Sequence, residues 1–532
     1  MEAADGTQSP VRQIKSKTLQ LTLQSAQQKN RGGVMTQENR FNLIDEPWIP
    51  VTGKGNVSLR EVFSRPDLSN PGGTPLEKIA LFRLLQAIAQ AAITPADEQD
   101  WRHLGVSGMA EACLNYLTAW HDAFWLYGPR PFLQFPAVRK AKKISYGSLM
   151  PDIASGNTSV LFQSQVEQSL DDAQKALLLL TGMSCCFGGK KVDKSVVLSP
   201  GVIKSASAKA GPALCSQGLL HTFLLGSSLR ESVWLNLLTQ ENLAEERLYE
   251  KGVGTPPWER MPAGEDDEVA RNLKRSLMGR LVPMARFYLL EEDGVHSVEG
   301  IQHPDYLQGG MVDPSVTGDR SAKKPRMIWA DPQKRPWRML TALLSFLKRD
   351  QKSPMRCLQL YWCVPRIQRS GQETLRLWSG GIRLRSNAGE QYLSGSDDVV
   401  ESELSLPVFS PDSESGDRDW FSAFQLAMER LEVMGKAVYM SVYEYYRDEK
   451  TDNASSLAAR ASLEFWQMAE RHFSALSESC SPQNGPEERE KVLRSLYGCV
   501  QECYARACPC ENSRQMELWA RNRPFSRKKK EG

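Results

Sequence analysis

The chain has 532 residues, of which 41% are hydrophobic and 24% are charged, and its net charge is +3. This composition is typical of a folded globular protein with two or three domains, and it excludes an intrinsically disordered chain. No hydrophobic run reaches the roughly 20 residues that a transmembrane helix needs, and the first residues lack a secretory signal, so we expect a cytoplasmic protein without a membrane partner.

The first part of the chain reads as a polar leader followed by helices. Residues 1–35 are rich in Gln, Ser and Lys, and we expect them to be a disordered leader that ends at a candidate native start, Met35. Residues 74–77 form a capping box with Pro75 at the first helical position, and apolar residues at helical spacing follow until Pro95. We expect further helices over residues 109–124 and around residues 175–180.

The middle of the chain reads as short strands and loops punctuated by Pro and Gly. A capping box over residues 228–231 predicts a helix that runs through Leu238. The segments with strand character are residues 219–225, 286–290, 358–364 and 374–378. Together these elements predict a mixed α/β domain with long loops over residues 36–409.

The last part of the chain has a different pattern. Residues 410–418 are acidic and rich in Ser, which predicts a linker. Beyond it, apolar residues at helical spacing predict three long helices and a shorter fourth, over residues 420–442, 457–473, 486–503 and 515–522. We therefore expect a C-terminal four-helix bundle over residues 419–532, and an α+β fold class for the whole chain.

Basic residues gather in three segments that otherwise read as loops. They are Arg139, Lys140, Lys142 and Lys143; Lys190, Lys191, Lys194, Lys204 and Lys209; and Arg320, Lys323, Lys324, Arg326, Lys334, Arg335 and Arg338. Solvated surface lysines explain any one such cluster, but three of them in loops favour contact with phosphate groups.

The sequence shows no pattern typical of an enzyme or of a metal site. It contains six His, and no Walker loop, His-Glu-x-x-His or Gly-x-Ser-x-Gly motif occurs. None of the 11 Cys forms a Cys-x-x-Cys pair, and an odd count without a signal peptide predicts reduced thiols. His472 lies beside Glu470 at a predicted helix end, where a cationic side chain also has a structural explanation. We predict no catalytic residue, no metal and no cofactor.

Two glycine-containing segments have both a structural and a nucleic-acid interpretation. Gly188, Gly189 and Lys190 combine close backbone approach with positive charge, as contact with a sugar-phosphate edge needs. The same residues also suit a helix end followed by a solvated loop. Residues 379–390 read as a strand that leads into a polar hairpin tip, for which Asn387 and Gly389 also suit an ordinary β-turn.

Short segments in a fixed order resemble the CasA family, the large subunit of the type I-E Cascade complex in CRISPR antiviral defence. The resemblance extends over residues 36–525, and its strongest pieces are residues 41–51 (FNLIDEPWIPV), 129–134 (PRPFLQ), 187–189 (FGG), 228–230 (SLR), 235–238 (LNLL) and 469–473 (AERHF).

The resemblance implies a DNA-binding and RNA-binding subunit that is not itself an enzyme. Such a subunit recognises the protospacer-adjacent motif (PAM) of duplex DNA, starts unwinding for pairing with crRNA, and recruits the trans-acting Cas helicase-nuclease. The implied partners are crRNA, double-stranded target DNA, the helicase-nuclease, and the backbone, handle-binding and small subunits of Cascade.

The resemblance also implies functional residues. A glycine loop that approaches the PAM corresponds to Gly188, Gly189 and Lys190, and a lysine finger corresponds to Lys323 or Lys324. A strand-separating wedge corresponds to Ser386, Asn387 and Ala388, although the Gln that is typical of this wedge is displaced here to Gln391. A loop that contacts the crRNA handle corresponds to Phe162, Gln163 and Ser164.

Two other hypotheses remain open at the level of sequence. One is a metal-independent enzyme that acts on nucleic acid, with His472 or His303 as the base. The other is a structural scaffold without nucleic-acid contact.

Overall fold

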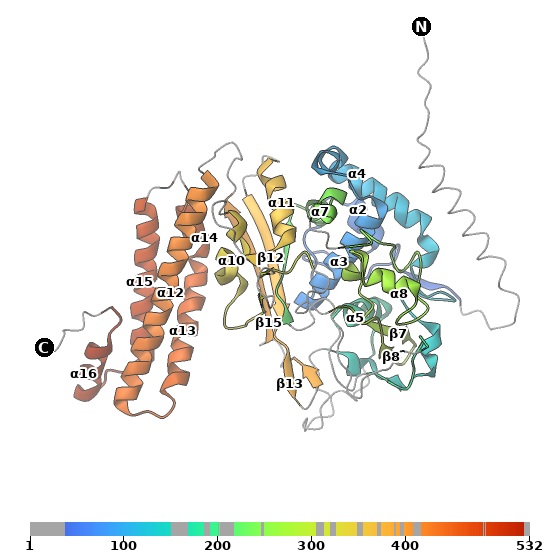
Figure 1. Cartoon of the computed structure of the whole chain (residues 1–532). Coiled ribbons are helices and arrows are strands. Elements are labelled where there is room, and N and C mark those ends of the chain that lie inside the picture. The colour runs from blue at the N-terminus through green and yellow to red at the C-terminus, as the bar shows by residue number, and fades with distance from the viewer. Residues whose placement is uncertain are drawn as a thin grey trace, which may run out of the picture.

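A computed structural model gives the fold of most of the chain (Figure 1). The described residues are 38–150, 169–185, 192–200, 202, 218–245, 249–304, 313–319, 326–347, 355–369, 374–387, 390–393, 398–407, 416–481, 484 and 486–525. The expected leader lies outside them.

The N-terminal part packs helices around small sheets. Its helices are α2 (Leu59–Ser64), α3 (Pro75–Ala92), α4 (Glu98–Ala119), α5 (Asp172–Ser184), α6 (Leu229–Leu235), α7 (Gln240–Glu245), α8 (Glu268–Leu273) and α9 (Met278–Leu281). Two strand pairs and one three-stranded sheet accompany them: β1 (Arg40–Asn42) with β4 (Trp125–Tyr127), β2 (Ile49–Val51) with β3 (Gly55–Val57), and β5 (Lys143–Ile144), β8 (Val295–Glu299) and β7 (Arg286–Leu290).

Helix α3 is the central helix of this part, and it begins where the sequence predicts. Thr74 accepts from the Glu77 amide and Glu77 accepts from the Thr74 amide, which completes the capping box. The helix is buried on nearly all sides, and its polar face carries Arg83, Gln86 and Gln90 at helical spacing. Gln86 and Gln90 donate to the carbonyls of the segment that follows α6, so the buried amides have partners.

A three-stranded antiparallel sheet joins the N-terminal part to the C-terminal helices. It has the order β15 (Val399–Pro407), β12 (Thr374–Ile382), β6 (His221–Leu225), and Gly380 of β12 lies opposite His221 of β6. A second small sheet has β9 (Gly318–Asp319) between β10 (Arg326–Met327) and β11 (Met355–Arg356). The short helical segments nearby are η7 (Pro336–Met339), α10 (Leu340–Leu343) and η8 (Ser345–Leu347).

The predicted strand over residues 358–364 is wrong, because these residues belong to helix α11 (Leu358–Arg369). Almost every residue of this segment is buried, so no exposed face marks the helical period in the sequence. Gln359, Cys363 and Arg366 recur at helical spacing, and the Gln359 and Arg366 side chains both donate to the Cys363 sulfur. Their shared orientation requires a helix.

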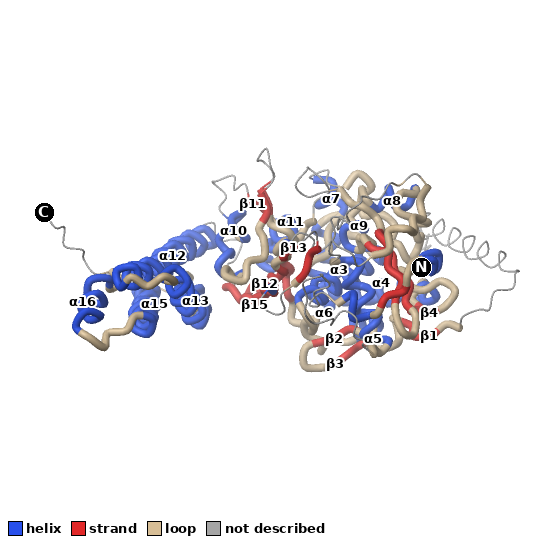
Figure 2. Tube along the Cα trace, turned by 90° about the horizontal axis from the view of Figure 1, so that it is seen from below, coloured by secondary structure: helices blue, strands red, loops and turns tan. Residues whose placement is uncertain are grey.

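The C-terminal helices follow the predicted pattern (Figure 1). They are α12 (Gly416–Glu449), α13 (Ala454–Arg471), α14 (Phe473–Ser479), α15 (Pro486–Ala507) and α16 (Ser513–Asn522). The long helices α12, α13 and α15 pack against one another, and the shorter α16 packs on α12. Together they lie at one end of the molecule (Figure 2). The α+β fold class is confirmed, whereas the exact domain division stays a prediction, since α12 begins inside the expected linker 410–418.

The described cysteines are mostly thiols. Eight of them are free, but Cys185 at the end of α5 is disulfide-bonded, so the expectation of reduced thiols is wrong at this position. Within the described ranges, no helix is both long and apolar enough to cross a membrane.

Candidate nucleic-acid interface

The hairpin that carries the predicted wedge extends from the end of strand β12. Its strands are β13 (Arg385–Asn387) and β14 (Glu390–Tyr392), with Arg385 opposite Tyr392 and Asn387 opposite Glu390. Figure 1 shows β13 beyond the lower ends of β12 and β15. The backbone of Ser386 and Asn387 lies in β13, and Ala388 lies outside the described residues.

The predicted lysine finger falls between two paired strands. Residues 320–325 connect β9 to β10, and Asp319 lies opposite Arg326 in the antiparallel pair. Lys323 and Lys324 are outside the described residues, but both ends of their segment are fixed by this pairing. The segment is therefore the connection of a second hairpin.

Gly218 and Leu219 join the roots of these two hairpins. On one side, Leu219 forms a β-bridge with Trp329, and the Ala330 amide donates to the Gly218 carbonyl at 2.8 Å. On the other side, a Cβ on Gly218 would lie 2.8 Å from the Ile382 carbonyl oxygen, and Gly218 has φ +76°. Only glycine fits this close approach without strain, so Gly218 allows the chain to pass directly beside the end of β12.

A buried polar network lies beneath the same sheet edge. The Arg83 guanidinium forms hydrogen bonds with the Asp313 carboxylate and the Ser315 hydroxyl, and His221 Nδ1 lies 2.9 Å from that hydroxyl. All four side chains are fully buried. The pair Arg83–Asp313 therefore fixes the chain just before β9, from which the basic segment departs.

Two further predicted sites fall outside the described residues. Gly188, Gly189 and Lys190 follow the end of α5, while Phe162, Gln163 and Ser164 precede its start. The described part resumes at residue 192, and the Asp193 amide donates to the Ser297 carbonyl of β8 at 2.9 Å. In the sequence, helix α5 thus lies between the two predicted sites.

Several basic residues predicted to contact phosphate are engaged within the protein. Arg335 donates to Glu470 of α13 at 2.5 and 2.7 Å, and Arg338 donates to Glu432 of α12 at 2.9 Å. Lys143 pairs with Asp293, and this hydrogen bond raises the pKa of the lysine. These three basic residues therefore use part of their charge in contacts within the protein, whereas Lys323 and Lys324 lie outside the described residues.

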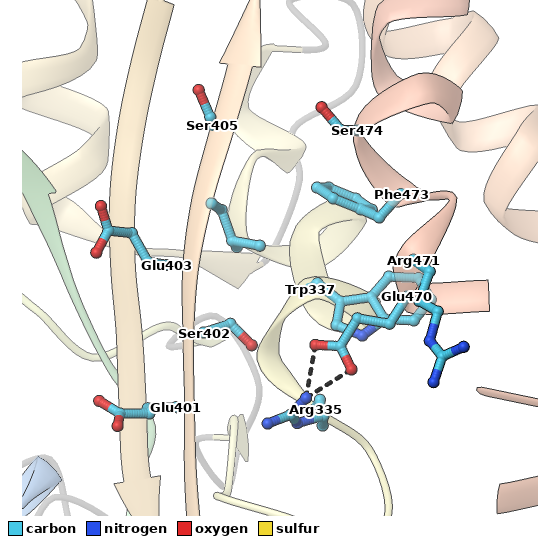
Figure 3. A pocket seen from close by; sticks show the side chains of 11 residues that line it. Arg335, Trp337, Glu401, Ser402, Glu403, Ser405, Glu470, Arg471, Phe473 and Ser474 are labelled. Atoms are coloured by element: carbon cyan, nitrogen blue, oxygen red, sulfur yellow. Dashed lines mark hydrogen bonds and ion pairs between the residues drawn. The ribbon is translucent and has the colours of Figure 1, made fainter. Parts of the chain in front are cut away.

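An open pocket of about 420 Å³ lies between β15 and the junction of α13 with α14 (Figure 3). Its lining includes both charge signs, and Figure 3 shows Arg335 paired with Glu470 on the side of the pocket opposite β15. Glu401 accepts from Lys78 and from the Trp378 indole, and Glu403 pairs with Arg376. We interpret this pocket as part of the contact between the N-terminal part and the C-terminal helices.

A pair of arginines at the hairpin root was missed in the sequence. Arg383 Nε and Nη2 donate to Asp398 Oδ1 at 3.0 and 2.9 Å, and Arg385 Nε donates to Asp398 Oδ2 at 2.6 Å. Asp398 is fully buried. Since Asp398 lies 13 residues beyond Arg385, only the pairing of β12 with β15 brings these charges together.

The histidines considered as catalytic bases have structural environments. His303 is buried and forms a 2.6 Å hydrogen bond with the Pro283 carbonyl, and burial lowers its pKa to about 3. His472 caps the end of α13, with the Cys499 sulfur 3.9 Å from its ring nitrogen. Ser315 and Asp313 both face the same ring nitrogen of His221, Nδ1, at 2.9 and 3.9 Å, so they lack the arrangement of a hydrolase triad, and all three side chains are fully buried.

Among the described residues, no group of three or more His, Cys, Asp or Glu could hold a metal ion. The absence of a metal from the whole chain stays a prediction.

Comparison with known proteins confirms the resemblance seen in the sequence. A curated CRISPR-associated protein CasA/Cse1 of Thermus thermophilus is 30% identical over 326 residues, which span 57% of this chain and 60% of that relative. The crystal structure of Thermobifida fusca Cse1 has a TM-score of 0.71 at 20% identity, and the match covers 91% of this chain and 96% of that one. A chain of a CRISPR RNA-guided surveillance complex has a TM-score of 0.64 at 18% identity, with 91% and 98% covered. These structures show the same fold.

The profile of the family described as CRISPR-associated protein Cse1 matches residues 42–503, from the first strand to the last long helix. The chain belongs to the CRISPR-associated protein Cse1 family.

Proposed function

We propose that this chain is the large subunit of a type I-E Cascade complex. It recognises the PAM of duplex DNA, starts unwinding for crRNA pairing, and recruits the trans-acting Cas helicase-nuclease. The observation that carries this proposal is the junction at Gly218 and Leu219, where the roots of a basic hairpin and a polar hairpin meet.

This junction suits a protein that holds a duplex and opens it at one place. A basic segment attracts the backbone and enters a groove, while a hairpin beside it pries the first base pairs apart. Unstacking costs a few kcal/mol, which guide pairing and backbone contacts offset. Because minor-groove readout is degenerate, such a subunit tolerates several related motifs.

The roles of individual residues follow the family pattern. PAM contact is assigned to Gly188, Gly189, Lys190, Lys323 and Lys324; strand separation to Ser386, Asn387 and Ala388; and the crRNA handle to Phe162, Gln163 and Ser164. The other Cascade subunits and crRNA are the proposed partners, and similar solved chains described as parts of RNA-guided surveillance complexes support this assignment.

We propose further that the subunit is not catalytic. His303 and His472 occupy structural positions, and the buried His221 meets both Ser315 and Asp313 at one ring nitrogen, which is not a triad arrangement. These observations support a binding role over the enzyme hypothesis.

The test is gel-shift binding by the guide complex assembled with and without this chain, on a panel of duplexes that differ only in the PAM. We expect discrimination among PAMs only when the chain is present, and DNA degradation only after the helicase-nuclease is added. PAM discrimination without the chain would refute the proposal. Cleavage by the purified chain that His472→Ala abolishes would favour the enzyme hypothesis.

A further inference from the structure

Two arginines at the root of the β13–β14 hairpin share a single buried carboxylate. Arg383 and Arg385 donate to different oxygens of Asp398, at 2.9 and 2.6 Å. The Arg383 amide also donates to the Asp398 carbonyl at 2.7 Å, so backbone and side chain are held together. The arginine side chains are 39% and 40% exposed, whereas that of Asp398 is 0% exposed.

This arrangement places two positive groups at the surface with their shared negative group beneath them. Arg376, earlier in the same strand β12, has the more ordinary arrangement, because it pairs with Glu403, whose side chain is 48% exposed. At the hairpin root the shared carboxylate is thus buried beneath the two guanidinium groups, whereas the carboxylate that pairs with Arg376 is itself exposed.

The arrangement also fixes the arginines before any ligand binds. A free arginine loses considerable side-chain entropy when a ligand immobilises it. Here, hydrogen bonds from both guanidinium groups to one carboxylate set their positions in advance. Planar guanidinium groups bind phosphate through paired hydrogen bonds, for which fixed orientation matters more than charge alone.

We infer that Asp398 holds Arg383 and Arg385 as a preformed receptor for a backbone phosphate of the target DNA. The receptor lies where β12 passes into β13, and this location sets the phosphate beside the hairpin that is proposed to separate the strands. The inference rests on the proposed function, because it takes the hairpin root as a DNA contact. In this receptor, the two arginines contact the phosphate, and Asp398 is a positioning residue that holds them.

The first test uses Asp398→Asn in the assembled guide complex, with a PAM-containing duplex as the probe. This change removes one negative charge, so general electrostatic attraction predicts tighter DNA binding. If Asp398 positions the two arginines, its loss should instead weaken DNA binding. We expect the affinity for the duplex to fall severalfold while guide-RNA assembly stays intact. Tighter binding by this variant would overturn the positioning role of Asp398.

The second test uses Arg383→Gln and Arg385→Gln. It tests the receptor even if the Asp398→Asn chain does not assemble into the guide complex. Each variant should lower the slope of log affinity against log salt by about 0.9, the value for one lost phosphate contact. Arg376→Gln is the matched control, and its slope should equal that of the wild type. Unchanged slopes in both arginine variants would refute the receptor, as would a defect in guide-RNA assembly with unchanged DNA binding.

The wild-type complex separates this inference from the proposed function. If the wild type does not discriminate among PAM duplexes, the proposed function fails. If the wild type discriminates while both arginine variants keep the wild-type slope of log affinity against log salt, only the proposed phosphate receptor is refuted.

Discussion

The Arg338 guanidinium lies over the Trp466 indole, with its central carbon 3.4 Å from the ring centroid. Arg338 belongs to η7 in the N-terminal part, and Trp466 belongs to helix α13. The same guanidinium donates to Glu432 of α12, and the arginine side chain is only 10% exposed. One residue thus attaches two C-terminal helices to the rest of the molecule.

Replacing Arg338 by Ala should weaken this attachment. A largely desolvated cation over an indole contributes about 2 kcal/mol, so we expect the free energy of unfolding to fall by about 1–2 kcal/mol. Arg335→Ala is the matched control, because its side chain is 51% exposed and its pair with Glu470 should contribute less than about 1 kcal/mol. Urea denaturation of the full chain measures both. Equal losses for the two variants would contradict the role assigned to the indole contact.

Asp313→Asn should be among the most destabilising single changes of a polar residue. It leaves the fully buried Arg83 without its counterion, which typically costs about 3–5 kcal/mol. Asp45→Asn provides the comparison, since Asp45 is 43% exposed beside Arg60 and should contribute less than about 1 kcal/mol. The midpoint of chemical denaturation tests the difference. A near-neutral effect of Asp313→Asn would show that the network is not an anchor.

His303 should make the protein less stable in mild acid. Burial and the nearby Arg280 lower its pKa to about 3 in the folded chain, against about 6.5 in an unfolded one. The unfolded state therefore binds more protons between these values, and stability falls as the pH drops through this range. In His303→Gln the free energy of unfolding should fall less steeply between about pH 6 and about pH 4, by up to about 1.4 kcal/mol per pH unit. Denaturation midpoints at several pH values measure this slope, with the exposed His103→Gln as the control. Identical slopes in His303→Gln and the wild type would contradict the prediction.

Gly189→Asp should weaken binding of a PAM duplex by the assembled complex. A side chain with negative charge would obstruct the close approach of backbone to the sugar-phosphate edge and repel it. Guide-RNA assembly should remain intact and serves as the control. Unchanged duplex affinity at fixed salt would remove Gly189 from the proposed interface.

Replacing both Lys323 and Lys324 by Ala should lower the dependence of log affinity on log salt by about 1 to 2, or about 0.9 for each lost phosphate contact. A finger that touches only base edges would lower affinity with little change in slope. No effect on either quantity would place the finger elsewhere, with Arg320 as the next candidate.

Local patterns in the sequence were sufficient for much of the secondary structure. The capping box at Thr74 and Glu77 determines where α3 begins, because its hydrogen bonds involve residues three positions apart. The C-terminal helices have one apolar and one polar face, so their period is visible without knowledge of their neighbours. The family was also predictable, because its motifs are short and keep their order.

Tertiary structure decided what depends on distant residues. Helix α11 is buried on nearly every side, so its period is hidden in the sequence and only its packing shows it. The sheet register brings Asp398 under Arg383 and Arg385, and the bridge between Leu219 and Trp329 joins the two hairpin roots. Arg335 and Arg338 looked like phosphate ligands, yet Glu470 and Glu432 lie 135 and 94 residues away in sequence and engage them. A single sequence shows which charges a chain carries, but the fold decides which of them are neutralised within the protein and which face a ligand.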